Sequence, residues 1–259
     1  MYKIIFCDVD GTLVNSEHRV TDLTRKAILD LKIPFVIVSA RSPSGIYPIL
    51  EKNGFDSAII AFSGALIQDE DRNIIYQNGL EIPLAKRIID FIESEKMSVA
   101  WNIFAGDKWI VKSRDDARVR REESIVEVKA SEGSIEFLKE GEVVHKILCM
   151  CNPDEIDDIE LTIRKHFPEV NAVKSSDILL EIMNKDVNKA DSVKRYCDTL
   201  NIDTDEVVAF GDNYNDVEML DLAGLGVLMG NAPDELKKRF EHITEDNDHD
   251  GIAKVLKLL

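Results

Sequence analysis

Two aspartates near the N-terminus, Asp8 and Asp10, are spaced so that both carboxylates can face one point. They follow the apolar run Tyr2–Cys7, which is typical of a buried strand, and Gly11 then lets the chain turn. Carboxylates this close repel each other unless a cation lies between them. Mg²⁺ accepts such oxygen ligands together with phosphate oxygens, and a carboxylate beside it can act as a nucleophile. Taken alone, the segment is equally compatible with an Asp-Gly turn that caps a helix.

A second acidic turn, from Asp212 to Asp216, follows the apolar run Val207–Phe210. Asp212 could be a further metal ligand, and Asp216 a supporting carboxylate. By itself this turn is explained as well by an N-cap of the next helix. Together with the first pair of aspartates it favours a metal site, and a set of oxygen donors without imidazole or thiolate favours Mg²⁺ over Zn²⁺.

Two further residues have side chains that could bind a phosphate. Lys189 is predicted to open a helix, where the helix N-terminus and the ammonium would both attract an anion. A solvated lysine is the alternative. Ser39 follows the apolar run Phe35–Val38, and its hydroxyl could donate a hydrogen bond to a phosphate oxygen. Its alternative role is the N-cap of a helix expected from Pro43.

The elements that must position these residues are strand-length apolar runs that alternate with amphipathic segments of helix length. The expected strands are Tyr2–Cys7, Phe35–Val38, Ala58–Phe62, Val207–Phe210 and Leu225–Met229, and the expected helices are Thr21–Leu31, Pro43–Asn53, Lys189–Leu200 and Asn215–Leu222. Continuously apolar runs are typical of parallel strands covered on both faces. The sequence therefore predicts an α/β core, a Rossmann-like parallel sheet with helices on both faces. Polar residues that follow its strands should converge at one edge, where ligands bind.

The middle of the chain has a different pattern, with alternating strands and hairpin turns. Val143–Met150 and Ile178–Met183 are two of the strands expected there. This pattern predicts an inserted α+β domain over residues 83–184, within a core made of residues 1–82 and 185–259.

The composition excludes several classes of partner. The 259 residues include 49 acidic and 32 basic side chains, a formal net charge of −17, which repels nucleic acid and anionic lipid. No apolar run approaches the ~20 residues that span a bilayer, and a carboxylate appears too early for a signal peptide. The four cysteines lack the spacing of a zinc site. We expect a cytoplasmic protein that binds neither nucleic acid nor membranes; the residues carry no signal for an oligomeric state.

In their order along the chain, these residues resemble the four motifs of the haloacid dehalogenase-like hydrolases. The motif residues are Asp8-Val9-Asp10-Gly11-Thr12, Ser39, Lys189 and Gly211-Asp212-x-x-Asn215-Asp216. The large insertion between the second and third motifs is similar to that of the Cof-type (class IIB) sugar-phosphatase branch, in which it forms a cap domain. The resemblance covers essentially the whole chain.

The resemblance implies a Mg²⁺-dependent phosphatase that hydrolyses a small phosphate monoester, such as a sugar phosphate, through an aspartyl-phosphate. Asp8 would be the nucleophile, and Asp10 would protonate the leaving alcohol and then activate water. The phosphoryl group would be held by Val9, Ser39, Ala40, Lys189 and Asn215, and the metal by Asp8, Asp212, Asp216 and the backbone carbonyl of Asp10.

The sequence departs from the family's pattern at three positions. Ser39-Ala40-Arg41 replaces the usual Thr-Gly-Arg, Ser63-Gly64 replaces Asn-Gly, and Ala190 replaces the glycine after the motif lysine. None of these changes removes a charged catalytic group, so they concern the substrate more than the reaction.

Two other functions are compatible with the motifs. A sugar phosphomutase shares the Asp-x-Asp start, but its cap should carry a well-placed set of arginines. The arginines of residues 114–121, among them Arg118 and Arg120, are expected on a salt-bridged, solvated face. Trp101 and Trp109 could stack on a sugar, yet packing within the inserted domain is expected. The other function, a non-catalytic binding module, predicts the loss of a catalytic carboxylate, and all of them are present.

Overall fold

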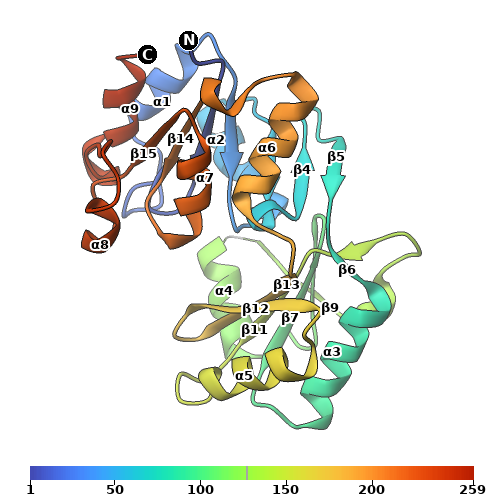
Figure 1. Ribbon diagram of the computed structural model, residues 1–259. Helices are drawn as coiled ribbons and strands as arrows, with labels where there is room; N and C mark the ends of the chain where they lie inside the picture. The colour runs from blue at the N-terminus through green and yellow to red at the C-terminus, as the bar shows by residue number, and fades with distance from the viewer. Residues whose placement is uncertain (127) are drawn as a thin grey trace. The chain divides into compact units, whose positions relative to one another are not determined.

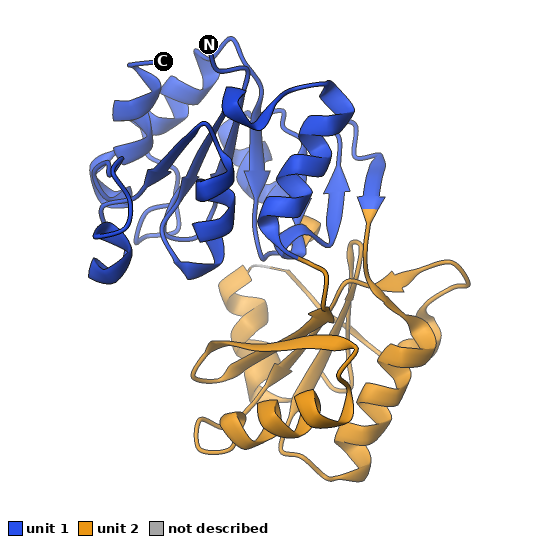
Figure 2. Ribbon diagram, viewed as in Figure 1, with its two compact units in different colours: residues 1–41, 46–76, 188–259 blue, residues 42–45, 77–187 orange. Residues whose placement is uncertain are grey.

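The computed structural model describes residues 1–126 and 128–259, which form two compact units (Figures 1 and 2). Unit 1 comprises Met1–Arg41, Ile46–Tyr76 and Asn188–Leu259, and unit 2 comprises Ser42–Gly45 and Gln77–Val187. The long excursion of the chain out of unit 1 thus runs from residue 77 to residue 187, and the inserted domain predicted from the sequence covers residues 83–184.

Within the described residues, unit 1 is built on a seven-stranded sheet in the order β15-β14-β1-β2-β3-β4-β5. These strands are β1 (Ile4–Asp8), β2 (Phe35–Val38), β3 (Ile59–Ala61), β4 (Leu66–Gln68), β5 (Ile74–Gln77), β14 (Val207–Gly211) and β15 (Leu225–Leu228). The strands from β15 to β3 are parallel to one another, and β4 runs antiparallel to β3. The predicted parallel α/β core is confirmed.

Helices cover both faces of this sheet (Figure 1). They are α1 (Asp22–Leu29), α2 (Pro43–Asn53), α6 (Lys189–Leu200), α7 (Val217–Leu222), α8 (Asp234–Lys237) and α9 (Gly251–Leu256). Along β1, Phe6 packs with Val193 and Tyr196 of α6, while its neighbour Ile5, which points to the opposite face, is also fully buried. Continuous apolar runs therefore mark strands with two covered faces. Among the described residues no helix combines the length and apolar character that crossing a bilayer requires.

Unit 2 contains a largely antiparallel sheet with helices and is therefore an α+β domain, as predicted. Its six-stranded sheet has the order β12-β13-β11-β7-β8-β9, and a short antiparallel pair joins β10 to β6. The strands are β6 (Leu80–Glu81), β7 (Ala100–Ala105), β8 (Lys108–Val111), β9 (Ser131–Glu132), β10 (Val143–Val144), β11 (Lys146–Met150), β12 (Val170–Ser176) and β13 (Leu179–Asn184). The helices are α3 (Ile82–Ser94), α4 (Ala117–Val126) and α5 (Ile156–His166). Ile88 and Ile92 of α3, one turn apart, belong to the same buried core of this unit as Ile159 and Ile163 of α5.

Both tryptophans are buried within unit 2, as predicted from the sequence. Trp101 belongs to the unit's core and donates a hydrogen bond from Nε1 to Glu93, at 3.0 Å. Trp109 stacks on Phe104 with ring centroids 5.6 Å apart, and its Nε1 donates to Asn102 at 2.9 Å. Each indole thus has its polar atom satisfied inside the unit, which is the usual condition for burying tryptophan.

The arginines around α4 form the expected ion pairs. Arg114 pairs with Glu123, Arg118 with Asp116, and Arg120 with Asp115. These local pairs confirm the salt-bridged arrangement predicted for residues 114–121.

His145, between β10 and β11, should make unit 2 sensitive to acid. Its ring is buried, Nδ1 accepts a hydrogen bond from the Gly106 amide at 3.0 Å, and burial lowers its pKa to about 4. A histidine kept neutral stabilises the fold above its ordinary pKa of about 6.5, and that stability is lost as pH falls toward 4. The difference between the pKa of this ring in the unfolded and folded protein corresponds to about 3 kcal/mol in the free energy of unfolding. In His145→Asn, an amide oxygen can accept the same bond without titrating.

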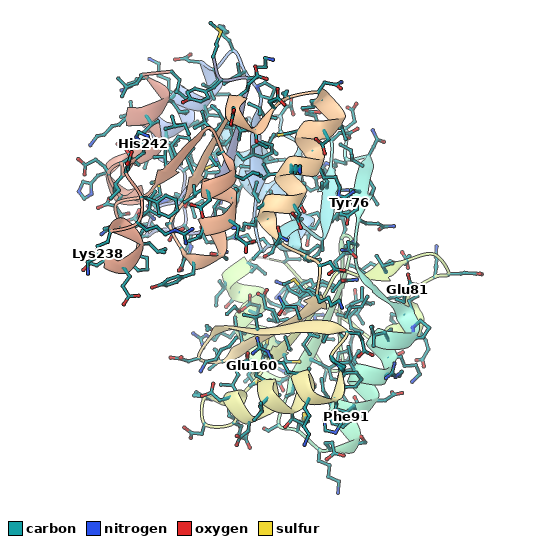
Figure 3. The ribbon with its side chains drawn as sticks, in the orientation of Figure 1. Tyr76, Glu81, Phe91, Glu160, Lys238 and His242 are labelled. Atoms are coloured by element: carbon teal, nitrogen blue, oxygen red, sulfur yellow. The ribbon has the colours of Figure 1, made fainter. Side chains whose placement is uncertain are left out.

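We therefore expect the free energy of unfolding, measured in urea, to fall between pH 7 and pH 4 by about 3 kcal/mol more in the wild type than in His145→Asn. The same substitution at exposed His242 of unit 1 (Figure 3) is the control and should keep the wild-type difference. Identical pH dependence in the wild type and His145→Asn would show that burial of this ring does not control acid stability.

Candidate active site

The candidate catalytic and binding residues of unit 1 lie at the carboxyl ends of its parallel strands. Asp8 is the last residue of β1 and is aligned with Val38 of β2, which Ser39 follows. On the other side of β1, Cys7 is aligned with Phe210 of β14, which Asp212 follows after one more residue. The sheet register therefore brings segments about 200 positions apart to one edge.

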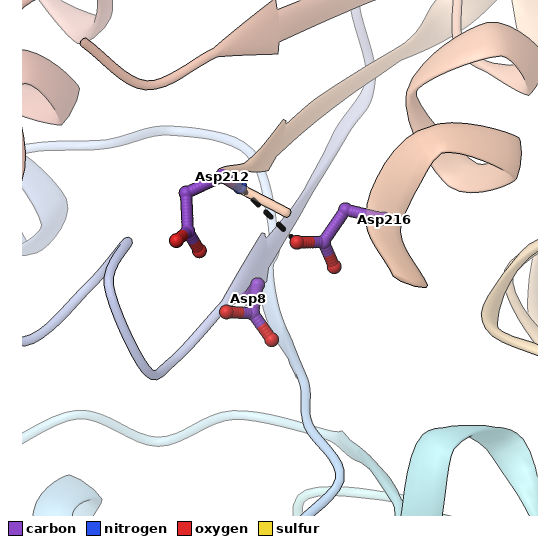
Figure 4. A group of neighbouring side chains, drawn as sticks. All are labelled: Asp8, Asp212 and Asp216. Atoms are coloured by element: carbon purple, nitrogen blue, oxygen red, sulfur yellow. Dashed lines mark hydrogen bonds between the residues drawn. The ribbon is translucent and has the colours of Figure 1, made fainter. Parts of the chain in front are cut away.

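Three carboxylates meet there (Figure 4). Oxygen atoms of Asp8, Asp212 and Asp216 all lie within 4.8 Å of one another. Asp8 and Asp216 are buried, and Asp212 is partly exposed. Asp216 also accepts hydrogen bonds from the amides of Asp212 and Asn213, each at 3.1 Å, so this carboxylate closes the turn as well as joining the cluster. The turn from Asp212 to Asp216 is thus both a helix cap and part of a carboxylate cluster, and each of the two roles considered from the sequence is present.

Lys189 is the cation at the centre of this cluster. Its Nζ donates to Asp8 Oδ1 and to Asp216 Oδ1, both at 2.6 Å, and only 2% of the residue is exposed. It is the first residue of α6, and the preceding Asn188 caps that helix by accepting from the Asp191 amide at 2.7 Å. The predicted helix start is confirmed, and a solvated lysine is excluded at this position.

The electrostatics of the cluster leave an excess of negative charge. Burial raises the pKa of Asp8 to about 8, with Lys189 opposing this rise and Asp216 adding to it. Burial, with a contribution from Asp216, raises the pKa of Asp212 to about 6. Burial disfavours the charged form of Lys189, but Asp8 and Asp216 outweigh that and hold its pKa above the ordinary value. Three carboxylates facing one ammonium, with oxygen as the donor atom, fit a hard divalent cation such as Mg²⁺.

The carboxylate of Asp10 is not part of this cluster. It is held by Arg41, whose Nε donates to Oδ2 at 2.8 Å and whose Nη2 donates to Oδ1 at 2.6 Å. The Asp10 side chain is 52% exposed and that of Arg41 24%. β1 ends at Asp8 and the chain turns through Gly11, so strand alternation no longer orients Asp10. The two carboxylates, which the spacing suggested could face one point, have different partners.

The other predicted phosphate-binding residues lie in the segments that follow β1, β2 and β14. Ser39 is buried, and its Oγ accepts a hydrogen bond from the Arg41 amide at 3.1 Å, which closes a short turn ahead of α2. Val9 is buried, Ala40 is partly buried, and Asn215 is exposed in the turn Tyr214–Asp216. All of them belong to unit 1.

Two residues not singled out from the sequence support Asp212. Thr12 donates from Oγ1 to Asp212 Oδ1 at 2.9 Å. Asn231, which follows β15, donates from Nδ2 to the Gly11 carbonyl at 2.8 Å and to Asp212 Oδ2 at 3.4 Å. Thr12 lies within the first motif and could have been noticed. Asn231 has no comparable signal, because only the sheet brings this residue, three positions after the end of β15, back to the first loop.

Gly11 leaves the space that Asp212 occupies, and filling that space should weaken metal binding. Gly11 has φ +83°, and a Cβ there would lie 2.4 Å from Asp212 Oδ2. Gly11→Ala should therefore displace Asp212, and we expect the Mg²⁺ dissociation constant to rise at least about tenfold, which corresponds to a loss of about 1.4 kcal/mol. The measurement is isothermal titration with Mg²⁺.

Gly106→Ala is the matched control, since Gly106 also has a positive φ (+57°) but its added Cβ would meet nothing within 4 Å. This variant should carry the backbone strain and retain the wild-type Mg²⁺ affinity. Equal affinities in Gly11→Ala and the wild type would contradict the role given to this space.

Comparisons with known proteins agree with this architecture. A family model described as haloacid dehalogenase-like hydrolase matches residues 5–256. A Haemophilus influenzae protein named "Putative phosphatase" is 35% identical, covering 99% of this chain and 98% of its own. "Putative phosphatase YkrA" of Bacillus subtilis is 31% identical, covering 99% of this chain and 97% of its own.

Solved structures share the fold over the whole chain. A crystal structure from Thermotoga maritima has a TM-score of 0.91 and 26% identity, covering 100% of this chain and 98% of that one. A sugar phosphatase described as subclass IIB of this superfamily has a TM-score of 0.81 and 23% identity, covering 99% of this chain and 98% of that one. The resemblance indicated by the motifs is therefore confirmed.

Proposed function

This chain belongs to the haloacid dehalogenase-like hydrolases and is a phosphatase, and we propose that it hydrolyses a small phosphate monoester, such as a sugar phosphate, through an aspartyl-phosphate on Asp8. The observation that carries the proposal is the placement of Asp8. Its carboxylate lies at the carboxyl edge of the parallel strands, 2.6 Å from the Lys189 ammonium and beside Asp212 and Asp216. A buried carboxylate with a cationic neighbour suits nucleophilic attack on an anionic phosphoryl group.

Mg²⁺ is the cofactor that this donor set fits best. Asp8, Asp212 and the backbone carbonyl of Asp10 would hold it, with Asp216 as the supporting carboxylate. When bound, the ion would neutralise negative charge on the phosphoryl oxygens and on the nucleophile. The excess of carboxylates over ammonium groups in the cluster supports this assignment.

In the first half-reaction, an oxygen of Asp8 forms a bond to phosphorus while the bond from phosphorus to the leaving alcohol oxygen breaks. Asp10, in its protonated form, gives its proton to that leaving oxygen, so the alcohol departs neutral. The partly exposed side chain of Asp10 suits this task, because a leaving group can reach it from solvent.

In the second half-reaction, the ionised Asp10 removes a proton from a water molecule whose oxygen attacks phosphorus. The bond between phosphorus and the Asp8 oxygen breaks, which releases inorganic phosphate and restores both aspartates. Lys189, the Ser39 hydroxyl, the backbone at Val9 and Ala40, and Asn215 would hold the phosphoryl oxygens throughout. Such positioning and charge neutralisation supply most of the catalysis in phosphoryl transfer.

We assign the catalytic core to residues 1–82 and 185–259 and a cap to residues 83–184. All residues with a proposed part in the chemistry belong to unit 1, which supports this division. The core residues act on the phosphoryl group and the metal, which every substrate shares. Discrimination between leaving groups is therefore assigned to the cap, as for closing domains in other enzymes.

No observation favours the mutase or the binding module. Arg114, Arg118 and Arg120 are engaged in ion pairs with neighbouring acidic residues. The four carboxylates expected of a catalyst are present, and three of them converge.

The cysteines and the charge bear on location and partner. The four cysteines are free thiols buried in the fold, which supports a reducing, cytoplasmic location. The net charge of −17 supports a small metabolite over nucleic acid as the partner.

The proposal is tested by incubating the protein with a panel of phosphorylated metabolites and Mg²⁺ and measuring released phosphate. We expect one class of sugar phosphate or related monoester to be hydrolysed with kcat/KM above about 10⁴ M⁻¹s⁻¹, the lower end of the range for enzymes acting on their own substrates. Absence of phosphate release across monoesters of sugars, nucleosides and polyols would contradict it.

A further inference from the structure

The ion pair between Arg41 and Asp10 has a geometry that does more than balance charge. Two nitrogens of one guanidinium, Nε and Nη2, donate to the two oxygens of one carboxylate, at 2.8 and 2.6 Å. This two-pronged contact fixes the rotation of the carboxylate plane as well as its position. A lysine, a point charge on a flexible chain, could not impose that orientation.

Arg41 is itself held by its backbone. Its amide donates to Ser39 Oγ at 3.1 Å, and its carbonyl accepts from the Phe62 amide at 2.9 Å. The next amide, that of Ser63, donates to the Ser39 carbonyl at 2.8 Å. Segment 39–41 is therefore attached at both ends to the turn that follows β3.

The turn after β3 has an unusual backbone. Phe62 and Ser63 have φ values of +51° and +54°, a left-handed conformation that side chains rarely adopt, and Phe62 is fully buried. Strain of this kind persists only where the surrounding structure enforces it, and it is concentrated at functional sites. Here it places two amides where they bind the backbone of Ser39 and Arg41.

We propose that Arg41 is a positioning residue for Asp10, which it orients for proton transfer to the leaving oxygen and from the attacking water. This inference rests on the proposed function of Asp10. The guanidinium binds one lone pair on each carboxylate oxygen, and each oxygen has a second. The Asp10 side chain is 52% exposed, so a leaving group can reach the lone pairs that Arg41 does not use.

In the first half-reaction, the timing of the charge supports the same role. When Asp10 gives its proton to the leaving oxygen, its carboxylate becomes negative, and this ionised form is the one that the two hydrogen bonds of Arg41 stabilise. An interaction that strengthens as the proton moves lowers the barrier rather than the energy of the bound substrate. A misplacement of about 1 Å can cost ~100-fold in rate, so loss of the two-pronged contact should slow the reaction measurably.

The test compares an alkyl with an aryl phosphate, because a good leaving group needs little protonation. Glycerol 2-phosphate and p-nitrophenyl phosphate are mixed with excess enzyme and Mg²⁺, and release of the alcohol or phenol is followed in a single turnover. Arg41→Met should slow the alkyl substrate about 10- to 100-fold and the aryl substrate less than about threefold. Arg41→Lys keeps the positive charge but cannot make the two-pronged contact. Its rate with the alkyl substrate should lie between those of the wild type and Arg41→Met.

A double variant separates positioning from direct substrate binding. If Arg41 acts through Asp10, adding Arg41→Met to Asp10→Asn should slow the alkyl reaction less than about twofold further. If Arg41 binds the substrate itself, Arg41→Met should slow the Asp10→Asn protein as much as it slows the wild type, and equally for both substrates. That result would overturn the proposal. Arg239→Met, which breaks a different arginine–aspartate pair in unit 1 (with Asp221), is the matched control and should react at the wild-type rate.

Failure of this inference differs from failure of the proposed function. If Asp10→Asn slows the alkyl substrate and neither Arg41→Met nor Arg41→Lys does, Asp10 keeps its role and the positioning role of Arg41 is wrong. If Asp10→Asn reacts at the wild-type rate with the alkyl substrate, the acid and base role of Asp10 is wrong, and the positioning role is overturned with it. Thermal unfolding of each variant shows that rates are compared between folded proteins.

Discussion

Asp8→Asn should abolish turnover and leave the protein folded. The amide has nearly the same shape as the carboxylate and can still accept a hydrogen bond from Lys189, but it cannot serve as the phosphate acceptor. Enzymes accelerate phosphate-monoester hydrolysis by up to ~10²¹-fold, so an enzyme without its nucleophile should release no detectable phosphate. We expect a loss of at least about 10⁴-fold in kcat, since removal of a triad nucleophile in another hydrolase costs about 10⁶-fold.

The same variant should not lose stability in the absence of metal. Burial raises the pKa of Asp8 to about 8, so the ionised carboxylate costs stability increasingly as pH rises from about 4 toward 8. Replacing it with a neutral amide removes that cost, and the melting temperature at pH 8 without Mg²⁺ should equal or exceed that of the wild type.

Released phosphate and thermal unfolding test both expectations. Asp56→Asn, the same change at an exposed aspartate of unit 1, is the control and should keep full activity. Wild-type phosphate release by Asp8→Asn, in a preparation free of host phosphatases, would refute the assignment of the nucleophile.

Removal of divalent cations should produce the second large loss. With Asp8, Asp212 and Asp216 converging on one point, the site needs positive charge before a phosphate dianion can approach. We expect EDTA followed by dialysis to abolish phosphate release and added Mg²⁺ to restore it. Zn²⁺, which prefers nitrogen and sulfur donors, should restore it poorly.

Mg²⁺ affinity should also depend on pH, because the metal binds ionised carboxylates. Burial raises the pKa of Asp8 to about 8 and that of Asp212 to about 6, so at pH 5 protons must be displaced before the ion binds. The Mg²⁺-dependent rise in melting temperature should therefore be larger at pH 8 than at pH 5. Asp212→Asn should show little of this rise at either pH. Full activity in excess chelator after extensive dialysis would count against a metal at this site.

Much of the fold is determined by local features of the sequence. The five apolar runs predicted as parallel strands all appear in the sheet of unit 1, with ends displaced by at most two residues, as in β1 (Ile4–Asp8) against the expected Tyr2–Cys7. Burial on two faces requires continuous apolarity, which is visible in the sequence itself. The change to alternating strands after residue 82 likewise indicated a second α+β unit.

The helix after β14 shows the limit of such reasoning. It was expected to begin at Asn215, but α7 begins at Val217 because Asn213 and Asp216 form a capping box around a separate 3₁₀ turn. That box is what directs Asp216 toward Asp8 and Lys189. Periodicity marks the helix, whereas the direction of a side chain in the turn before it depends on hydrogen bonds that the periodicity does not contain.

Which carboxylates meet was therefore decided by the tertiary structure. The sequence placed Asp8, Asp10, Asp212 and Asp216 after strands that share an edge, because parallel strands must end together. Asp216 joins the cluster and the Asp10 carboxylate leaves it for Arg41, 31 positions away. Strand alternation orients side chains only as far as the last paired residue. Beyond that residue the orientation follows from turn geometry, such as the positive φ of Gly11 and Phe62, and from partners that only folding brings within reach.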